Sequence, residues 1–464
     1  MANPTEAHAS AGSPVRWSSS FTLYLSSAGA AVGLGSIWRF PYLAGTNGGC
    51  AFIVVFVLAC TFIAIPFLVA ELALGRNSQR SPPEAAGEVA RRHGLSTRWN
   101  AIGIMGSFSA FLIFTYYTVI AGWVLAYTWK CATGLLSQAG PQEVPRLWSR
   151  FLASPFEVGC WHLAFLLIVA FICARGVKRG IEIANKIRAP ALLALLCILV
   201  GYSLKTGDVS RGLSFAFRPD FTAVNGRVIL AAVGQAFFAT GVGQGMIMAY
   251  GAYAAPGMSL FRTAVIVSAS ILLVSLLATL MIFPMVFHYG MDPAQGSQLV
   301  FEVLPRVFAE MPGGRLVGSL FFLLLTLAAL IPATGVLEPA VAWLVQRFEV
   351  ARGKAVWLCT ATAWVLGIGS VLSFNLWAGW HPLGFLPGFA AKTYFDVLDY
   401  VTANFLGPIG ALLTSLLLGW RITDVLAATE LAETNPIARR TCIWALRYLC
   451  PIALFAVFAT AVIA

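Results

Sequence analysis

Long apolar segments recur along this chain almost to its C-terminal end. Each is about 20 residues long, the length that an α-helix needs to cross a hydrocarbon layer of about 30 Å. A water-soluble core could not bury them all, because 59% of the 464 residues are hydrophobic and only 11% are charged. The chain is therefore expected to be an all-α polytopic membrane protein. About eleven transmembrane helices are predicted, near 21-46, 50-74, 99-130, 160-175, 180-204, 228-254, 259-289, 315-346, 355-377, 394-420 and 441-463.

The basic residues predict how the chain is oriented in the bilayer. Residues 1-20 are polar and lack the order of a signal peptide, so they are expected to form a cytoplasmic N-terminal tail. With that start, the loops on the cytoplasmic side carry most of the Arg and Lys residues, as in the positive-inside rule. The net charge of +11 then reflects a multi-pass position in the cell (cytoplasmic or inner) membrane. No nucleic-acid partner is expected, since the cations are scattered over many loops.

The nine cysteines lack the spacing of metal ligands. Most lie in or beside apolar segments and are expected to be small packing residues. Cys131 and Cys160 stand at the two ends of the long loop that follows the third predicted span. A disulfide between them is one alternative, and two free thiols are the other.

Two of the membrane segments are interrupted by glycine. They read AVGLGSIWRF at 31-40 and AVGQAFFATGVGQG at 232-245, five spans apart. An interior glycine costs a helix about 1 kcal/mol relative to alanine. Unwinding at mid-membrane frees carbonyls and amides that can hold a solute and its ions. Glycines that only permit close helix packing are the alternative, but two matched breaks favour an inverted-repeat transporter.

Longer motifs carry a family resemblance. They are SSAGAAVGLGSIWRFPYLAGTNGGCAF (26-52), ELALGR (71-76), TYYTVIAGW (115-123), GIEIANKIRAP (180-190) and AAVGQAFFATGVGQG (231-245). In this order and spacing the chain resembles the neurotransmitter:sodium symporter family over nearly its whole length, as a divergent bacterial member. The resemblance implies the LeuT fold, a 5+5 inverted repeat with helices 1 and 6 broken. Its first repeat would span 21-205, its second 228-421, and a peripheral helix 11 would span 441-464.

The resemblance also implies a substrate pocket between the two breaks. A tyrosine, Tyr117, corresponds to the residue whose hydroxyl donates to a substrate carboxylate. Gly33 stands where the family's monoamine carriers have an aspartate, so the substrate is expected to bring its own carboxylate. The backbone groups that would hold the amino and carboxylate groups belong to Ala31, Leu34, Gly35, Phe238, Ala239 and Gly241. The side-chain subsite would be lined by Ile113, Tyr117, Phe238, Gly241, Gln244, Pro332 and Val336.

An outer gate is expected above this pocket. Arg39 and Asp399 correspond to the family's outer ion pair, with Phe238 beneath them. An arginine and an aspartate within apolar spans are costly unless they are paired or hydrated. Asp396 lies one turn before Asp399 and could share the arginine.

The inner gate matches the family only in part. Trp17 and Tyr253 correspond to its aromatic residues, whereas Gln346 occupies the place of its aspartate. Glu71 matches a buried glutamate that hydrogen-bonds the broken helices. A structural carboxylate is the preferred interpretation of Glu71, and a proton carrier is the alternative.

The sodium sites are where this sequence departs from the family. Gly29, Val32 and Ala328 match the backbone ligands of the second site, but its hydroxyl pair is replaced by Ile331 and Pro332. Sodium is a hard cation that needs oxygen ligands in place of its water, and neither side chain offers one. The four positions of the first site read Ala31, Ser36, Ala239 and Ile271. No cofactor is expected, and sodium stays a candidate ion without its side-chain ligands.

These observations predict a secondary transporter of an amino acid or amino-acid-like solute, working by alternating access with doubtful sodium coupling. Uniport, exchange and proton coupling are the alternatives for the driving force. A non-transporting receptor or sensor for such a ligand is the alternative function. An enzyme is not expected, because no GxSxG or HExxH motif is present. The expected partners are a small-molecule substrate and the lipid bilayer, and the sequence leaves the oligomeric state open.

Overall fold

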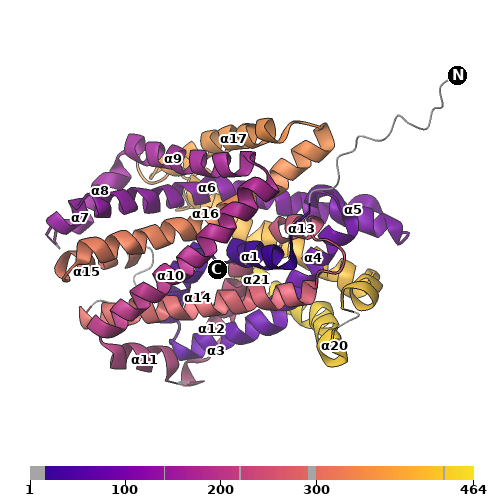
Figure 1. Ribbon diagram of the computed structural model, residues 1–464, viewed down its shortest axis with the longest axis horizontal. Helices are drawn as coiled ribbons and strands as arrows, with labels where there is room; N and C mark the ends of the chain where they lie inside the picture. Colours follow the sequence, from indigo (N-terminus) through magenta and orange to yellow (C-terminus); the bar gives the residue numbers. More distant parts are fainter. Residues whose placement is uncertain (1–15, 141, 219–220, 291–298, 432–433, 464) are drawn as a thin grey trace.

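A bundle of long helices makes up the protein (Figure 1). The computed structural model describes residues 16–140, 142–218, 221–290, 299–431 and 434–463. Within these ranges nine helical stretches are long and apolar enough to cross a membrane. They are Cys50–Ser78, Thr97–Ala132, Pro155–Ala174, Val177–Thr206, Leu260–His288, Gly314–Phe348, Arg352–Leu372, Tyr394–Arg421 and Pro436–Ala459.

The first predicted span is a broken helix. It consists of α1 (Ser20–Ala31) and a second part, Gly35–Thr46, that ends with α2 (Phe40–Thr46). The two parts meet at an angle of 55°. Ser19 begins α1 with a capping box, in which its side chain accepts from the Thr22 amide. The backbone of Val32, just after α1, is extended, so the helix does not continue through the break.

The sixth predicted span is also broken. Its two parts are α12 (Gly226–Thr240), with 15 residues, and α13 (Met246–Ala252), with 7 residues. Neither part alone is long enough to cross a bilayer. The link between them contains Gly241, Gly243 and Gly245, all at positive φ, a conformation that a residue with a Cβ adopts only at a cost. The described part of the chain thus has nine long apolar stretches, or ten spans when the bent first pair is counted as one, against about eleven predicted. The shorter apolar helix Gly226–Thr240 lies where the sixth span was predicted.

The remaining helices surround the breaks. Figure 1 shows α1 and α13 in the middle of the bundle, with α14 and α10 crossing nearby. The long helix α6 packs along α16, and α13 packs against α4. The α-helices outside the two broken spans are α3 (Cys50–Ala59), α4 (Ile65–Ser78), α5 (Pro82–Arg92), α6 (Ala101–Ala132), α7 (Leu135–Gln138), α8 (Val144–Ala153), α9 (Pro155–Ala174), α10 (Ile183–Thr206), α11 (Val209–Phe217), α14 (Leu260–His288), α15 (Leu304–Glu310), α16 (Gly314–Phe348), α17 (Arg352–Leu372), α18 (Tyr394–Val401), α19 (Gly407–Leu416), α20 (Pro436–Trp444) and α21 (Cys450–Ile463).

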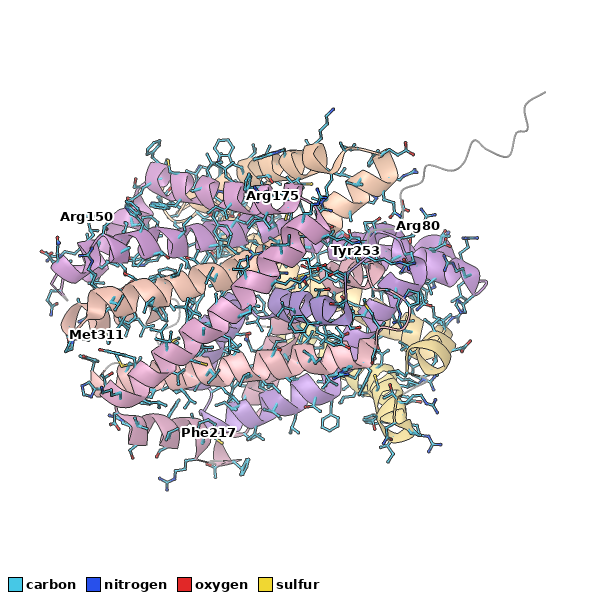
Figure 2. The ribbon with its side chains drawn as sticks, viewed as in Figure 1. Arg80, Arg150, Arg175, Phe217, Tyr253 and Met311 are labelled. Atoms are coloured by element: carbon cyan, nitrogen blue, oxygen red, sulfur yellow. The ribbon has the colours of Figure 1, made fainter. Side chains whose placement is uncertain are left out.

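The short connecting helices gather at the two ends of the bundle. In Figure 1, α5 lies toward the right-hand end of the view, whereas α7, α8, α11 and α15 lie toward the left-hand end. Figure 2 places Arg80 and Tyr253 toward the right-hand end and Arg150 and Met311 at the left-hand end. The loop after the second predicted span, with Arg80, and the loop after the third, with Arg150, therefore lie at opposite ends of the molecule.

The alternative of a disulfide between Cys131 and Cys160 is not realised, and both thiols are free. Cys131 is buried at the end of α6, where its Sγ lies close to Gly318, and Cys160 is exposed on α9. The two residues flank the same loop, but their side chains lie in different environments. The position of the two cysteines at the ends of one loop does not show that Cys131 is buried and Cys160 is exposed.

Candidate functional site

The two helix breaks face each other in the centre of the bundle. The side-chain amide of Gln235 on α12 donates to the carbonyl oxygen of Gly35 over 2.9 Å. A Cβ at Gly35 would lie only 2.7 Å from the ring of Phe238, so the second break can approach the first only because this residue is glycine. The glycines in the sequence thus permit a direct contact between backbone and ring across the two broken spans.

Glu71 supports the second break. Its Oε1 accepts a hydrogen bond from the amide of Gly243 over 2.5 Å, and the side chain is buried on α4. An unwound backbone amide in a membrane interior has to find an acceptor in the protein. This geometry agrees with the preferred interpretation of Glu71 as a structural carboxylate.

A small cavity of about 60 Å³ lies between the breaks. Every residue predicted for the substrate pocket lines it: Ala31, Leu34, Gly35, Ile113, Tyr117, Phe238, Ala239, Gly241, Gln244, Pro332 and Val336. Gly33 lines it as well, and so do two residues that the sequence analysis missed, Ala30 and Met246. Both follow from the breaks themselves, because Ala30 directly precedes Ala31, the last residue of α1, and Met246 begins α13.

The cavity offers polar groups without a charged side chain among the described residues that line it. The hydroxyl of Tyr117 points to α16 and donates to the carbonyl oxygen of Ala329 over 3.2 Å. The side chain of Gln244 and the backbone groups at the breaks supply the other polar atoms. Such a lining suits a small solute that carries its own charges, because the backbone dipoles at half-helix ends can stabilise them.

A second cavity of about 280 Å³ adjoins this one. Arg39 and Asp399 both line it, together with Phe238, which lines both cavities. The Arg39 guanidinium lies over the Phe238 ring at 4.2 Å, and Asp399 accepts from the Tyr116 hydroxyl over 3.2 Å. Arg39 and Asp399 are not among the ion pairs within 4.0 Å in the described part of the chain, so the two residues of the expected outer gate line one cavity without pairing.

The suggestion that Asp396 shares Arg39 does not fit the geometry. Asp396 lies in the first turn of α18, and its Oδ2 accepts from both the amide and the hydroxyl of Thr393. The two residues form a capping box at the N-terminus of that helix. Asp396 is therefore engaged locally.

The segment that precedes α1 packs on the C-terminal end of α13, where the inner gate is expected. The indole nitrogen of Trp17 donates to the carbonyl oxygen of Tyr250, and its amide donates to that of Tyr253, each over 3.0 Å. The indole also makes edge contacts with both tyrosine rings, at 5.2 and 6.1 Å. The two residues predicted for the inner gate, Trp17 and Tyr253, are thus in contact.

A buried ion pair, which the sequence analysis missed, continues these contacts. Arg352 at the start of α17 donates from two nitrogens to Glu338 on α16, over 2.9 and 2.6 Å. The Tyr253 hydroxyl donates to the same carboxylate over 2.7 Å. The signal that could have found it is a glutamate inside the apolar span of α16, since such a charge needs a partner.

Two further contacts involve the altered inner gate. Gln346, in the place of the family's aspartate, accepts from the Ser81 amide over 2.6 Å. In the second contact, Ser18 donates through its amide and its hydroxyl to Glu182, and Glu182 also pairs with Lys186 over 2.8 Å. The N-terminal segment is thus tied to the start of the fifth span by a carboxylate instead of through Gln346.

Apolar side chains occupy the neighbourhood of the second sodium-site positions. Gly29 lies on α1 and Ala328 on α16, two helices that pack on each other, and Val32 directly follows α1. A Cβ at Gly29 would lie 2.9 Å from Cγ2 of Ile331, and one at Gly33 would lie 2.7 Å from Cγ of Pro332. The side chains that replace the hydroxyl pair therefore pack directly on the broken helix, and this donor set does not fit a sodium ion.

At the first sodium-site positions one hydroxyl is present. Ser36 is fully buried, and its Oγ has no hydrogen-bond partner among the described residues. Ala239 and Ile271, both buried, contribute hydrocarbon side chains. Only backbone oxygens and one serine could serve an ion there.

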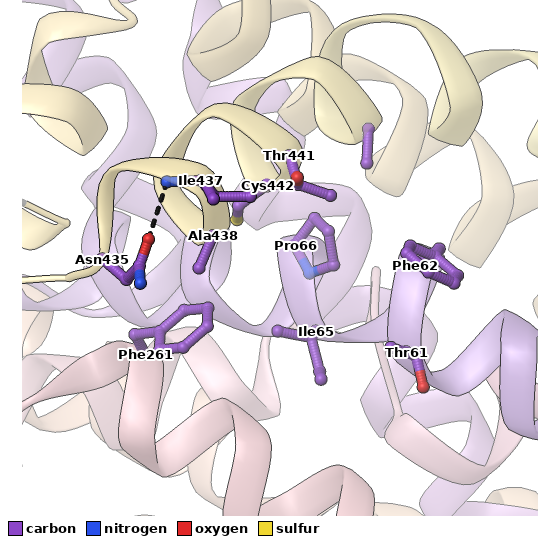
Figure 3. Close-up of a pocket in the computed structure, with 11 residues that line it drawn as sticks. Thr61, Phe62, Ile65, Pro66, Phe261, Asn435, Ile437, Ala438, Thr441 and Cys442 are labelled. Atoms are coloured by element: carbon purple, nitrogen blue, oxygen red, sulfur yellow. Dashed lines mark hydrogen bonds between the residues drawn. The ribbon is translucent and has the colours of Figure 1, made fainter.

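A separate groove of about 390 Å³ lies on the periphery of the bundle, between α4, α14 and α20 (Figure 3). Phe62, Pro66 and Phe261 line it together with Ile437 and Cys442. None of its lining residues belongs to either helix break. It plays no part in the candidate site.

Comparison with known proteins gives a consistent family assignment. The model of the sodium:neurotransmitter symporter family matches residues 15–142 and 156–406. A protein of Bacillus subtilis named as an uncharacterized sodium-dependent transporter is 34% identical over 448 residues, which are 96% of this chain and 97% of that protein. A Haemophilus influenzae protein of the same description is 33% identical over 426 residues, covering 90% of this chain and 92% of that protein.

A solved structure shares the fold. It is the crystal structure of MhsT in complex with L-phenylalanine, which is similar to this chain with a TM-score of 0.86 and 36% sequence identity. The similarity covers 97% of this chain and 100% of the other. The LeuT fold that the motifs implied is thereby confirmed.

Proposed function

The chain belongs to the sodium:neurotransmitter symporter family, and from that premise we propose that it carries an amino acid or close analogue across the cell membrane by alternating access. Family and fold are those of membrane transporters and not of enzymes. Among the relatives described above, the names are those of transporters, and nothing favours the alternative of a receptor or sensor.

The lining of the central cavity is the main support for an amino acid as the solute. Residues from two distant helix breaks and from α6 and α16 line a single cavity without a charged side chain. Free backbone groups and the Tyr117 hydroxyl can complement an ammonium and a carboxylate on the same small molecule. MhsT, with a similar fold, has been crystallised with L-phenylalanine, which supports the same class of solute here.

The alternating cycle is supported by the difference between the two sides of this cavity. On one side, Arg39 and Asp399 line a cavity of about 280 Å³ without forming an ion pair. On the other side, Trp17 and the Tyr253–Glu338–Arg352 contacts join the N-terminal segment, α13, α16 and α17. Unpaired gate residues on one side and paired residues on the other are the difference that rocking of one repeat against the other would invert.

We also propose that sodium coupling is weak or absent. Ile331 and Pro332 bring hydrocarbon where the second sodium site needs oxygens, and the first site keeps one serine hydroxyl. The relatives are named sodium-dependent transporters, so this chain would differ from them in its driving force. The positive-inside pattern supports a cytoplasmic N-terminus, at the end of the molecule where α5 lies.

Flux measurements in proteoliposomes test the proposal. The purified protein is reconstituted, and uptake of labelled amino acids is followed with internal unlabelled amino acid present, in sodium and in potassium medium. We expect saturable uptake of one or a few amino acids, similar in both salts. Uptake only in sodium would contradict the proposed coupling. Ligand-dependent stabilisation without any flux or counterflow would contradict the transporter and favour a sensor.

A further inference from the structure

A buried arginine on α10 takes no part in the contacts described so far. Arg188 is 6% exposed. Its Nε donates to the carbonyl oxygen of Ala184 and its Nη2 to the side-chain oxygen of Asn185, at 3.1 and 3.0 Å. Its Nη1 has no hydrogen-bond partner in the described part of the chain, nor has the side-chain nitrogen of the fully buried Asn185.

No carboxylate of the described residues forms an ion pair with Arg188 within 4.0 Å. Within the described part of the chain, Cys173 and Tyr250 are the titratable side chains close enough to interact electrostatically with Arg188, and both types are neutral at pH 7. Glu338 is already paired with Arg352. An unpaired guanidinium inside a membrane protein is expensive, and residues of this kind usually mark a pathway for an ion or substrate.

The location of Arg188 relates it to the central cavity. Met246 lines that cavity. Met246 and Tyr250 both pack on Gly335, with the Met246 Sδ and the Tyr250 hydroxyl 2.5 and 3.3 Å from the position of a Cβ there. Tyr250 thus lies one layer further from the outside than Met246, between the cavity and Trp17, whose indole donates to the Tyr250 carbonyl oxygen.

We infer that Arg188 and Asn185 form an anion-binding station on the inner half of the solute's route. The two free groups, Nη1–H and Nδ2–H, are both donors, so the ligand they lack is an acceptor. A guanidinium and an amide side by side suit a small monovalent anion, either the carboxylate of the leaving solute or chloride. Tyr250 lies beside Arg188 and its carbonyl oxygen holds the Trp17 indole, so movement of the N-terminal segment would open this side of the station. The inference rests on the proposed function, because it assigns Arg188 to the same route.

Thermal unfolding of the full-length purified protein tests the station without any amino acid present. Trp17→Ala removes the indole and is compared with Trp17→Ala/Arg188→Gln and with Trp17→Ala/Lys186→Gln. Lys186 is the matched control, a cation two residues away that is 44% exposed and paired with Glu182. Potassium acetate and potassium chloride are titrated against potassium methanesulfonate at equal ionic strength.

We expect acetate, chloride or both to raise the Tm of Trp17→Ala saturably by at least about 2 °C, since a ligand that binds the folded state stabilises it. The rise should vanish with Arg188→Gln and persist with Lys186→Gln. Acetate alone would identify a carboxylate station, and a chloride response a halide one.

No anion response, or an unchanged response with Arg188→Gln, would overturn the inference. If Trp17→Ala does not fold, Trp17→Phe removes the indole hydrogen bond and keeps a ring, and Arg188→Lys keeps the charge. This test measures thermal unfolding and no flux. A negative result would therefore overturn the anion site without bearing on the proposed transport, which the flux measurements test separately.

Discussion

The side chain of Ile331 lies directly against Gly29. Its Cγ2 is 2.9 Å from the point where a Cβ at Gly29 would stand, and Pro332 packs on Gly33 in the same way. Hydrocarbon therefore fills the contact between α1 and α16 at the positions where the family binds its second sodium.

Restoring hydroxyls at this contact should create a response to sodium. In Ile331→Thr/Pro332→Ser, two hydroxyl oxygens join the backbone oxygens near Gly29, which gives a hard cation more of its preferred ligands. We expect sodium to raise the Tm of the double variant relative to potassium, while the wild type unfolds at the same temperature in both salts. Leu330→Thr, a hydroxyl on the neighbouring residue of α16, should not respond. Sodium stabilisation of the wild type would contradict the prediction.

The hydroxyl of Tyr117 should contribute to substrate affinity. It lies at the cavity and donates to the Ala329 carbonyl oxygen, a bond that it can exchange for one to a carboxylate. Hydrogen bonds to charged groups contribute about 1.5–3 kcal/mol, so Tyr117→Phe should weaken amino-acid binding about 10-fold or more. Isothermal titration with the best amino acid from the flux screen measures this. Tyr127→Phe, on the same helix and outside the cavity, is the control, and equal losses in both variants would refute a specific role.

Glu71 should matter for stability more than for proton coupling. Glu71→Ala leaves the Gly243 amide without its acceptor, which should cost about 1.5–3 kcal/mol of unfolding free energy. Glu71→Gln keeps an acceptor oxygen and should unfold close to the wild type, with transport that depends on pH as before. Both are checked by denaturation and by uptake at several pH values. A stable Glu71→Gln that lost a proton-driven component would instead favour the proton-carrier alternative.

The Glu338–Arg352 pair should be sensitive to loss of one partner. The carboxylate is fully buried and its arginine partner 21% exposed, so removing either charge leaves the other uncompensated at a cost of about 3–5 kcal/mol. Glu338→Gln and Arg352→Gln should each unfold at lower temperature, and the double variant should recover part of that loss. The cycle of four proteins measures the coupling. Additive losses would show that the two residues act independently.

Gly243 should not tolerate a side chain. Its φ is +81°, and a Cβ would lie 2.2 Å from the carbonyl oxygen of Gly407. Gly243→Ala is therefore expected to lower the Tm strongly and to reduce uptake, because the second break must rearrange. Gly234→Ala on α12 is the matched control, since nothing lies within 4 Å of its Cβ position. It should leave the Tm unchanged or raise it slightly. Similar behaviour of the two variants would argue against a requirement for this backbone conformation.

The sequence by itself determined the features that depend on local patterns. Apolar length indicates a membrane span, and glycine clusters indicate where a helix can unwind, so the long apolar stretches and the two breaks were predictable. The motif spacing was sufficient to name the residues around the central cavity, from Ala31 to Val336, because they lie on the breaks or at fixed helical positions opposite them.

Only the tertiary structure decided which polar groups meet. Arg39 and Asp399 share a cavity without pairing, Asp396 caps its own helix, and Glu338 binds Arg352. Side-chain partners across a bundle depend on how helices rotate and pack, which residue type and spacing alone do not specify. For the same reason Arg188 reads in the sequence as one more cation near a helix end, and its burial without a carboxylate is visible only when α10 is packed against its neighbours.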